Sequence, residues 1–145
     1  MTSLLLALAV AVLGWQEQTP RAIDLLEASG HQYEKSGTGW AVHFEGTNQK
    51  QIRIFLVQVE DLIVLGSILA TKADVADRAG LHEALLVASD DIDYVKTVID
   101  NDGDYALRTD LLAAGLTAKR FTDQLIQIAR AADQLRPVVD KYRKK

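Results

Sequence analysis

Cysteine is absent from this chain of 145 residues. Its absence excludes a disulfide framework, a thiolate zinc site, an iron–sulfur cluster and a cysteine nucleophile. Histidine is scarce as well, with three residues, which limits any imidazole-rich metal site. Basic residues do not predominate: 16 Lys plus Arg stand against 20 Asp plus Glu, for a net charge of -4. Nucleic-acid binding calls for a basic excess, so we expect no nucleic-acid partner, and we expect no cofactor.

The remaining composition is that of a folded protein. Hydrophobic residues make up 48% of the chain and charged residues 25%, a balance too apolar for a disordered chain. A chain of this length has room for one substantial core. We therefore expect one folded domain.

The longest apolar run lies at the N-terminus. Residues 4–14 carry no charge, and they are fewer than the roughly 20 residues that a membrane-spanning helix needs. The run is typical of a secretory signal, with small residues at Val12 and Gly14 before a cleavage point at Trp15. The first three positions lack a basic residue, and the alternative is a buried N-terminal helix or strand. We predict a signal peptide over 1–14 and a periplasmic or secreted protein with no stable membrane span; the alternative location is cytoplasmic.

After a linker at 15–18, the chain predicts one helix and three strands. Thr19 and Pro20 are typical of a helix start, and Gly30 is typical of a helix end. Alternating apolar residues then predict strands over 40–45, 52–59 and 62–70. Short turns between them favour an antiparallel meander. Gly66, inside the third strand, indicates a bulge or a close neighbour.

A second helix is predicted over 73–89. Thr71 or Asp74 would cap its first turn. Gly80 costs about 1 kcal/mol relative to alanine and would weaken or kink it. Two strands, over 94–99 and from Tyr105 to Thr109, follow this helix.

The last helix begins after its predicted cap, Thr117. Apolar residues recur within it at spacings of four and three, which predicts a stripe facing the core. These residues are Phe121, Leu125, Ile128, Ala132 and Leu135. Pro137 is predicted to end or kink this helix. Residues 141–145 form a basic tail, which we interpret as frayed and solubilising; the alternative is contact with acidic lipid or an acidic partner.

An Asp-rich segment separates the last two strands. Asp102-Gly103 favours a hairpin with a primed turn. A calcium loop of the EF-hand type, begun at Asp100, would need Gly and Glu where the chain has Tyr105 and Leu111. The hairpin is therefore the preferred interpretation, and a weak cation site is the alternative.

Catalytic motifs are missing from the sequence. The chain has no phosphate-binding loop, no nucleophile elbow and no zinc-binding helix. His43 and Glu45, two residues apart on one strand face, could form a general acid–base pair. Nothing else in the sequence converges on them, so we predict no catalytic, cofactor-binding or metal-binding residue.

The element order is helix, three strands, helix, two strands, helix. Strands in separate groups between helices predict an α+β domain over 19–140, with helices packed on an antiparallel sheet. The pattern resembles the YbjN family of bacterial proteins, which are labelled sensory transduction regulators. Four stretches carry the resemblance: residues 94–103, 107–111, 115–117 and 131–137. The resemblance implies a fold like that of type III secretion chaperones.

The same resemblance implies a role without an active site. We expect a non-enzymatic, exported protein-binding domain, chaperone-like or regulatory, with a protein partner and a homodimeric state. The second helix or an adjacent strand would form the dimer. The alternative is a small-ligand binder or enzyme with an apolar cavity near Trp40, Phe44 and His43, to which Phe55, Tyr94 and Tyr105 could contribute.

Overall fold

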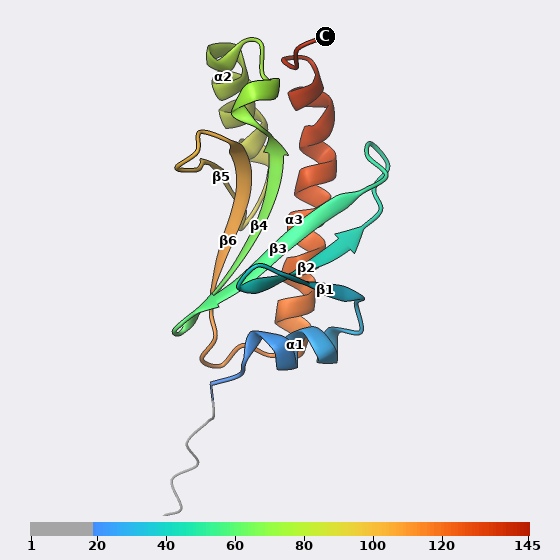
Figure 1. The fold of residues 1–145 in the computed structure, drawn as a ribbon, viewed down its shortest axis with the longest axis vertical. Helices are drawn as coiled ribbons and strands as arrows, with labels where there is room; N and C mark the ends of the chain where they lie inside the picture. The colour runs from blue at the N-terminus through green and yellow to red at the C-terminus, as the bar shows by residue number, and fades with distance from the viewer. Residues whose placement is uncertain (1–18) are drawn as a thin grey trace, which may run out of the picture.

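The computed structural model describes residues 19–145, so the predicted signal peptide and the linker at 15–18 lie outside it. The described chain forms three α-helices and one antiparallel sheet of six strands in the order β1-β2-β3-β4-β6-β5 (Figure 1). The helices are α1 (Ala22–Ser29), α2 (Arg78–Ala88) and α3 (Ala118–Asp140). The strands are β1 (Tyr33–Ser36), β2 (Gly39–Phe44), β3 (Ile52–Val59), β4 (Leu62–Ala70), β5 (Lys96–Ile99) and β6 (Tyr105–Leu112). The predicted α+β class is confirmed.

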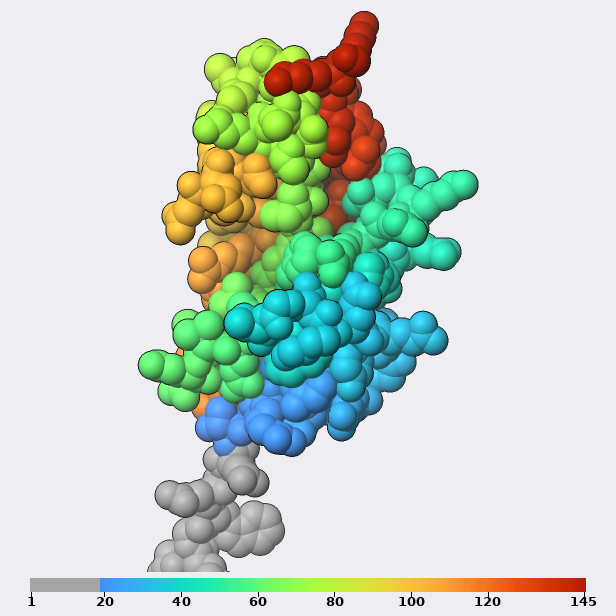
Figure 2. Space-filling model, in the orientation of Figure 1, coloured from blue at the N-terminus to red at the C-terminus, as the bar shows by residue number. Residues whose placement is uncertain are grey.

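One long helix covers one face of the sheet. The five apolar residues predicted to form a stripe on α3 are all buried, with at most 1% of each exposed. They pack with alternate residues of β3, β4 and β6, such as Leu56, Leu65 and Leu107. Most of α3 is hidden behind the strands in the view of Figure 2. No helix within residues 19–145 has both the length and the apolar character needed to cross a bilayer.

The first helix ends as predicted but begins later. Gly30 adopts φ 72°, the left-handed conformation that ends a helix. The N-cap is Arg21 rather than Thr19, and Arg21 makes no capping hydrogen bond with its side chain. The reason is tertiary, because the N–H of Ala22 donates to Oε1 of Gln58 on β3 at 2.7 Å.

Strand β1 was not predicted. It pairs with β2 through a two-residue turn in which Gly37 has φ 56°. Tyr33, Glu34 and Lys35 are all exposed, so the strand has no alternation of buried and exposed residues to mark it. The predicted bulge at Gly66 is also misplaced, since the irregularity of β4 falls between Ile68 and Ala70.

The second helix is shorter than predicted. Residues 72–74 form a 3-10 turn, Val75 is extended, and α2 begins only after its N-cap, Asp77. The carboxylate of Asp77 accepts a hydrogen bond from the N–H of Gly80, so neither predicted cap serves α2. Gly80 lies in the first turn, and a Cβ there would come within 2.7 Å of the Tyr142 ring. A glycine is therefore required by close packing at this position.

The basic tail is docked, which corrects the prediction that it is frayed. Val75 and Arg143 form an isolated antiparallel bridge. The N–H of Ala76 donates to the carbonyl of Tyr142 at 2.8 Å, and that of Lys144 donates to the carbonyl of Asp74 at 2.8 Å. The C-terminus thus holds the chain extended at Val75, within the stretch that was predicted as the start of the second helix.

The last helix passes through Pro137 and ends at Asp140, so this proline does not end it. Proline has no N–H to donate to the carbonyl four residues before it. That carbonyl belongs to Asp133, and it accepts a hydrogen bond from Nδ2 of Asn48 at 3.0 Å. A side chain from the turn between β2 and β3 therefore replaces the missing helical hydrogen bond.

The carboxylate of Asp133 holds the same turn. Its oxygens accept hydrogen bonds from the backbone N–H groups of Thr47, Asn48 and Gln49 at 3.0, 2.8 and 3.1 Å. Gly46 lies so close to this carboxylate that an added Cβ would overlap it. Asp133 thus fixes the turn between β2 and β3 against the C-terminal half of α3.

The hairpin between β5 and β6 is confirmed, but its turn is not of the primed type. The N–H of Gly103 donates to the carbonyl of Asp100 at 3.0 Å, and the N–H of Asp100 donates to the carbonyl of Asp104 at 3.0 Å. In this turn only Gly103, at φ 86°, has a positive φ. A primed turn needs positive φ before the last position of the turn. The carboxylate of Asp100 accepts from the N–H groups of Asp102 and Asp104 and so stabilises the turn.

We predict that Asp133→Ala lowers the free energy of unfolding by about 2 kcal/mol, because three backbone N–H groups lose a charged acceptor. The matched control is Asp123→Ala on the same helix, which removes one exposed ion pair with Lys119 and should cost less than about 0.5 kcal/mol. Chemical denaturation of both variants measures the difference. Equal losses would show that Asp133 does not anchor the turn.

Candidate protein-binding surfaces

The structure does not bring His43 and Glu45 together as an acid–base pair. Nε2 of His43 lies 3.1 Å from Oε1 of Glu34 on β1, and Nη2 of Arg53 lies 2.9 Å from the same oxygen. The hydrogen bond from His43 lowers the pKa of Glu34, and Arg53 adds to this effect while burial opposes it. All three side chains are about half exposed, so the cluster is a surface ion network with no enclosed space for a substrate.

The aromatic residues considered for a ligand cavity lie apart from one another. Phe55 is on the sheet face opposite α3, with the Arg53 guanidinium 4.6 Å from its ring centroid. Phe44 packs on His31 at 4.9 Å, and Tyr94 is 80% exposed. Trp40 is half-buried beneath Lys35. These side chains line no common cavity in the described chain, so nothing in their placement favours the small-ligand alternative.

A polar cluster that sequence analysis missed lies between α2 and β6. The Tyr105 hydroxyl, in a residue only 1% exposed, lies 2.9 Å from Nε2 of His82 and accepts from Nε of Arg78 at 3.2 Å. Arg78 also reaches the carbonyl of Gly103. No local pattern marks the cluster, since 23 residues separate His82 from Tyr105. With its groups bonded to one another, the cluster ties α2 to the hairpin between β5 and β6.

We predict that Tyr105→Phe lowers the free energy of unfolding by about 1–2 kcal/mol, because His82 and Arg78 lose a buried partner. Tyr33→Phe is the matched control, because the Tyr33 hydroxyl is exposed and lies 3.5 Å from Glu27. Thermal unfolding of both variants at neutral pH provides the comparison. An unchanged midpoint for Tyr105→Phe would contradict a stabilising role for the cluster.

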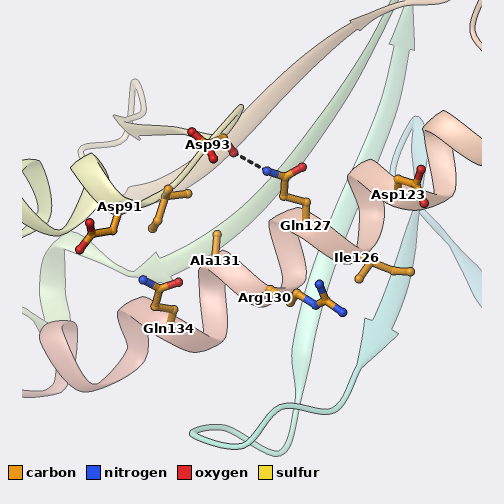
Figure 3. A pocket seen from close by; sticks show the side chains of 9 residues that line it. Asp91, Asp93, Asp123, Ile126, Gln127, Arg130, Ala131 and Gln134 are labelled. Atoms are coloured by element: carbon orange, nitrogen blue, oxygen red, sulfur yellow. Dashed lines mark hydrogen bonds between the residues drawn. The ribbon is translucent and has the colours of Figure 1, made fainter.

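The acidic segment from residue 90 to 110 holds no metal-ligand cluster. Within residues 19–145 no group of three or more His, Asp or Glu side chains is placed to hold a metal ion. A groove of about 490 Å³ does lie between Asp91–Asp93 and α3 (Figure 3). Nε2 of Gln127 donates to the carbonyl of Asp93 at 2.6 Å across it. The groove is polar and open. The hydrogen bond across it joins the segment that follows η2 (Ser89–Asp91) to α3.

The most exposed apolar side chains on a helix lie next to each other on α2. Leu86 is 73% exposed and Val87 is 70% exposed. The opposite side of α2 buries Leu81 and Leu85 in the core. Because monomeric surfaces seldom present such pairs on a regular element without a partner, this pair, the α2 apolar face, is a candidate contact surface.

The sheet face opposite α3 carries apolar side chains edged by ion pairs. Val59 and Ile68 are about half exposed on it. Lys96 and Arg108 both pair with the carboxylate of Asp110, at 2.5 and 2.7 Å. Burial acts to raise the pKa of Asp110, but these two hydrogen bonds outweigh it, and the pKa is lowered. Asp110 therefore stays ionised at neutral pH.

A second groove, of about 530 Å³, runs along the end of β6. We call it the β6 groove. It is lined by Tyr94, Thr109, Asp110, Leu111, Leu112, Ala114, Leu116, Arg120 and Gln124. Tyr94 and Leu112 are 80% and 68% exposed at its rim. Sequence reasoning missed this groove because the groove depends on how far along β6 the pairing with β5 extends.

The sequence of this chain matches the model of one protein family. The model of the YbjN family, described as "Putative bacterial sensory transduction regulator", matches residues 9–141. The chain belongs to this family, and the resemblance drawn from the sequence is confirmed.

A solved structure has the same fold. The chain is similar to "Crystal structure of YbjN, a putative transcription regulator from E. coli", with a TM-score of 0.60 and 13% identity over 88% of this chain and 98% of that one. It is also similar, at a TM-score of 0.43, to a chain of "Crystal Structure of the ExsC-ExsE Complex", with 14% identity over 68% of this chain and 75% of that one. The comparison with curated proteins gives no match.

Proposed function

We propose that this protein is an exported, non-enzymatic domain that binds another protein, in a regulatory or chaperone-like role. The observation that carries the proposal is the exposure of large apolar side chains on regular elements, above all on the α2 apolar face. Such surfaces on a well-packed domain are typical of contact sites between proteins. The family description as a regulator supports the same role.

The domain acts as a homodimer in this proposal. Leu86 and Val87 lie side by side near the C-terminal end of α2, and two copies of this helix can cross about a two-fold axis so that each pair covers the other. Exposed large apolar residues on a helix gain about 1.5–3 kcal/mol each when fully buried. The opposite sheet face and the β6 groove stay open for a different partner.

We predict that the double variant Leu86→Glu, Val87→Glu is monomeric, because it places charges in the proposed interface. Size-exclusion chromatography with light scattering gives the mass of the variant, and the wild type is measured beside it. The control Glu83→Gln on the same helix should keep the wild-type mass. A monomeric wild type would end the dimer proposal.

Export is part of the proposal and rests on the apolar run at residues 4–14. We predict that the protein recovered from the bacterial envelope begins at Trp15. Intact-mass spectrometry of that protein, beside the same protein retained in the cytoplasm, locates the cleavage. A chain in the envelope that keeps its first 14 residues would contradict removal, and a chain confined to the cytoplasm would contradict export.

Partner binding is tested by affinity purification from the envelope, with cross-linking before lysis. We expect a specific protein to be recovered with the wild type and with Glu83→Gln. A partner recovered equally by an unrelated exported domain would count as background. Recovery of no specific partner under these conditions would contradict the proposed protein-binding function.

A further inference from the structure

The edge of β6 is only partly paired. Strand β5 pairs with β6 from Ile99 opposite Tyr105 to Lys96 opposite Arg108, and the pairing stops there. On the other edge, β4 pairs with β6 as far as Leu112. The last four residues of β6, 109–112, therefore have a strand on one side and none on the other within residues 19–145.

The backbone of Tyr94 accounts for this gap. Tyr94 has φ 60°, one of two non-glycine residues in the described chain with a positive φ. This left-handed conformation turns the chain away from β6 immediately before β5 begins. The carbonyl of Tyr94 instead accepts a hydrogen bond from the Thr109 hydroxyl at 3.2 Å. The turn leaves an open notch beside residues 109–112.

Two hydrogen bonds show which backbone groups point into the notch. The carbonyl of Asp104 bonds to Asp100 on the β5 side, and the N–H of Ala113 bonds to Asp61 on the β4 side. Since successive residues of a strand direct their groups to opposite edges, the N–H and C=O of Asp110 and Leu112 point into the notch. No described backbone group is bonded to them there. They offer hydrogen bonds that only an extended backbone can match in register.

The size of the notch favours a short segment over a second copy of this chain. Only four residues of β6 are open, and the β6 groove beside them holds about 530 Å³. Stable interfaces between proteins bury roughly 1,600 Å² in total. An edge this short meets that requirement poorly, whereas it suits a single extended peptide segment.

The charges around the notch favour an acidic segment. Arg120, on the α3 side of the β6 groove, has no acidic partner in the described structure. On the opposite side Lys96 and Arg108 share the single carboxylate of Asp110. The charge of Asp110 is thus offset by its own two partners, and Arg120 is the cation in the groove lining that is left without a carboxylate among residues 19–145. Apolar contact is offered at the same place by Leu112, which is 68% exposed.

We propose that the β6 groove binds an extended acidic segment of a partner protein, which adds as a strand to β6 beside Asp110 and Leu112. Acidic side chains on one face of the segment lie toward Arg120, and apolar side chains on the other face pack on Leu112. Strand addition supplies affinity through the backbone, and the alternating side chains supply selectivity. This inference rests on the proposed protein-binding function and names the site and chemistry of the partner.

The test uses the full chain and a labelled peptide of three Glu-Val repeats. We expect binding by fluorescence anisotropy, and in amide NMR spectra we expect the Asp110 and Leu112 signals to shift and gain protection from exchange. The same peptide with its alternate backbone nitrogens methylated cannot form the ladder and should not bind. A peptide of three Lys-Val repeats should bind at least about fivefold more weakly, as an unfavourable charge pair would require.

Variants on α3 separate local charge from overall charge. Arg120→Glu should weaken binding of the Glu-Val peptide about fivefold or more and improve binding of the Lys-Val peptide. Arg130→Glu makes the same change in charge on the same helix away from the β6 groove, and it should leave both peptides unaffected. Equal effects of the two variants would overturn the proposal.

Other occupants of the notch give different results, and each overturns the proposal. Protection of the Asp110 and Leu112 amides that appears without peptide and grows with protein concentration would assign the edge to a second copy. Protection that is independent of concentration would mean that the chain covers its own edge. A methylated peptide that binds as well as the parent would exclude strand addition. If the Glu-Val peptide does not bind at the β6 groove but the dimer and a specific partner are both found, the proposed function stands without this site.

Discussion

The burial of one apolar stripe, along α3, organises this protein. Phe121, Leu125 and Ile128 lie on the same side of the helix and cover the middle of the sheet. A single helix is about 10 Å wide with its side chains and neighbouring strands lie about 4.8 Å apart, so α3 covers the central strands β3, β4 and β6 on one face of the sheet. The same constraint leaves the sheet's outer strands dependent on contacts other than this stripe. Figure 1 shows the result, with α1 and α2 placed at opposite ends of the sheet.

Polar contacts in the C-terminal half of α3 and just beyond it hold segments that the apolar stripe does not reach. Near its C-terminal end, Asp133 receives the backbone N–H groups of the turn between β2 and β3, and Asn48 replaces the hydrogen bond that Pro137 cannot make. Beyond the helix, Arg143 bonds to the carbonyl of Leu69 and pairs its backbone with Val75. The stretch from Ala131 to Pro137, which carried part of the family resemblance, thus has a structural role. It joins the helix to a turn more than 80 residues earlier in the chain.

The two candidate contact surfaces, the α2 apolar face and the β6 groove, result from the way α2 packs and from the place where β5 begins. The α2 apolar face exists because α2 buries only its Leu81 and Leu85 side. The β6 groove exists because the chain turns at Tyr94 and β5 begins only opposite Arg108, short of the end of β6. Within residues 19–145 neither surface contains a nucleophile beside a base, and the polar cluster around Tyr105 is satisfied by its own members. Exposed apolar groups and unpaired backbone are features that recognise other polypeptides, because hydrophobic burial and ladder hydrogen bonds require a matching chain.

The sequence by itself determined the α+β class, the core stripe of α3, the Thr117 cap and the Gly30 helix end, because each depends on neighbours within a few residues. It did not reveal β1, whose residues are exposed, or the true start of α2, which the C-terminal residues impose. The cap of α1 and the continuation of α3 through Pro137 depend on Gln58 and Asn48, which are distant in sequence. Tertiary structure decided these features, and with them the open edge of β6, because backbone groups take whichever partner the packed fold brings within reach.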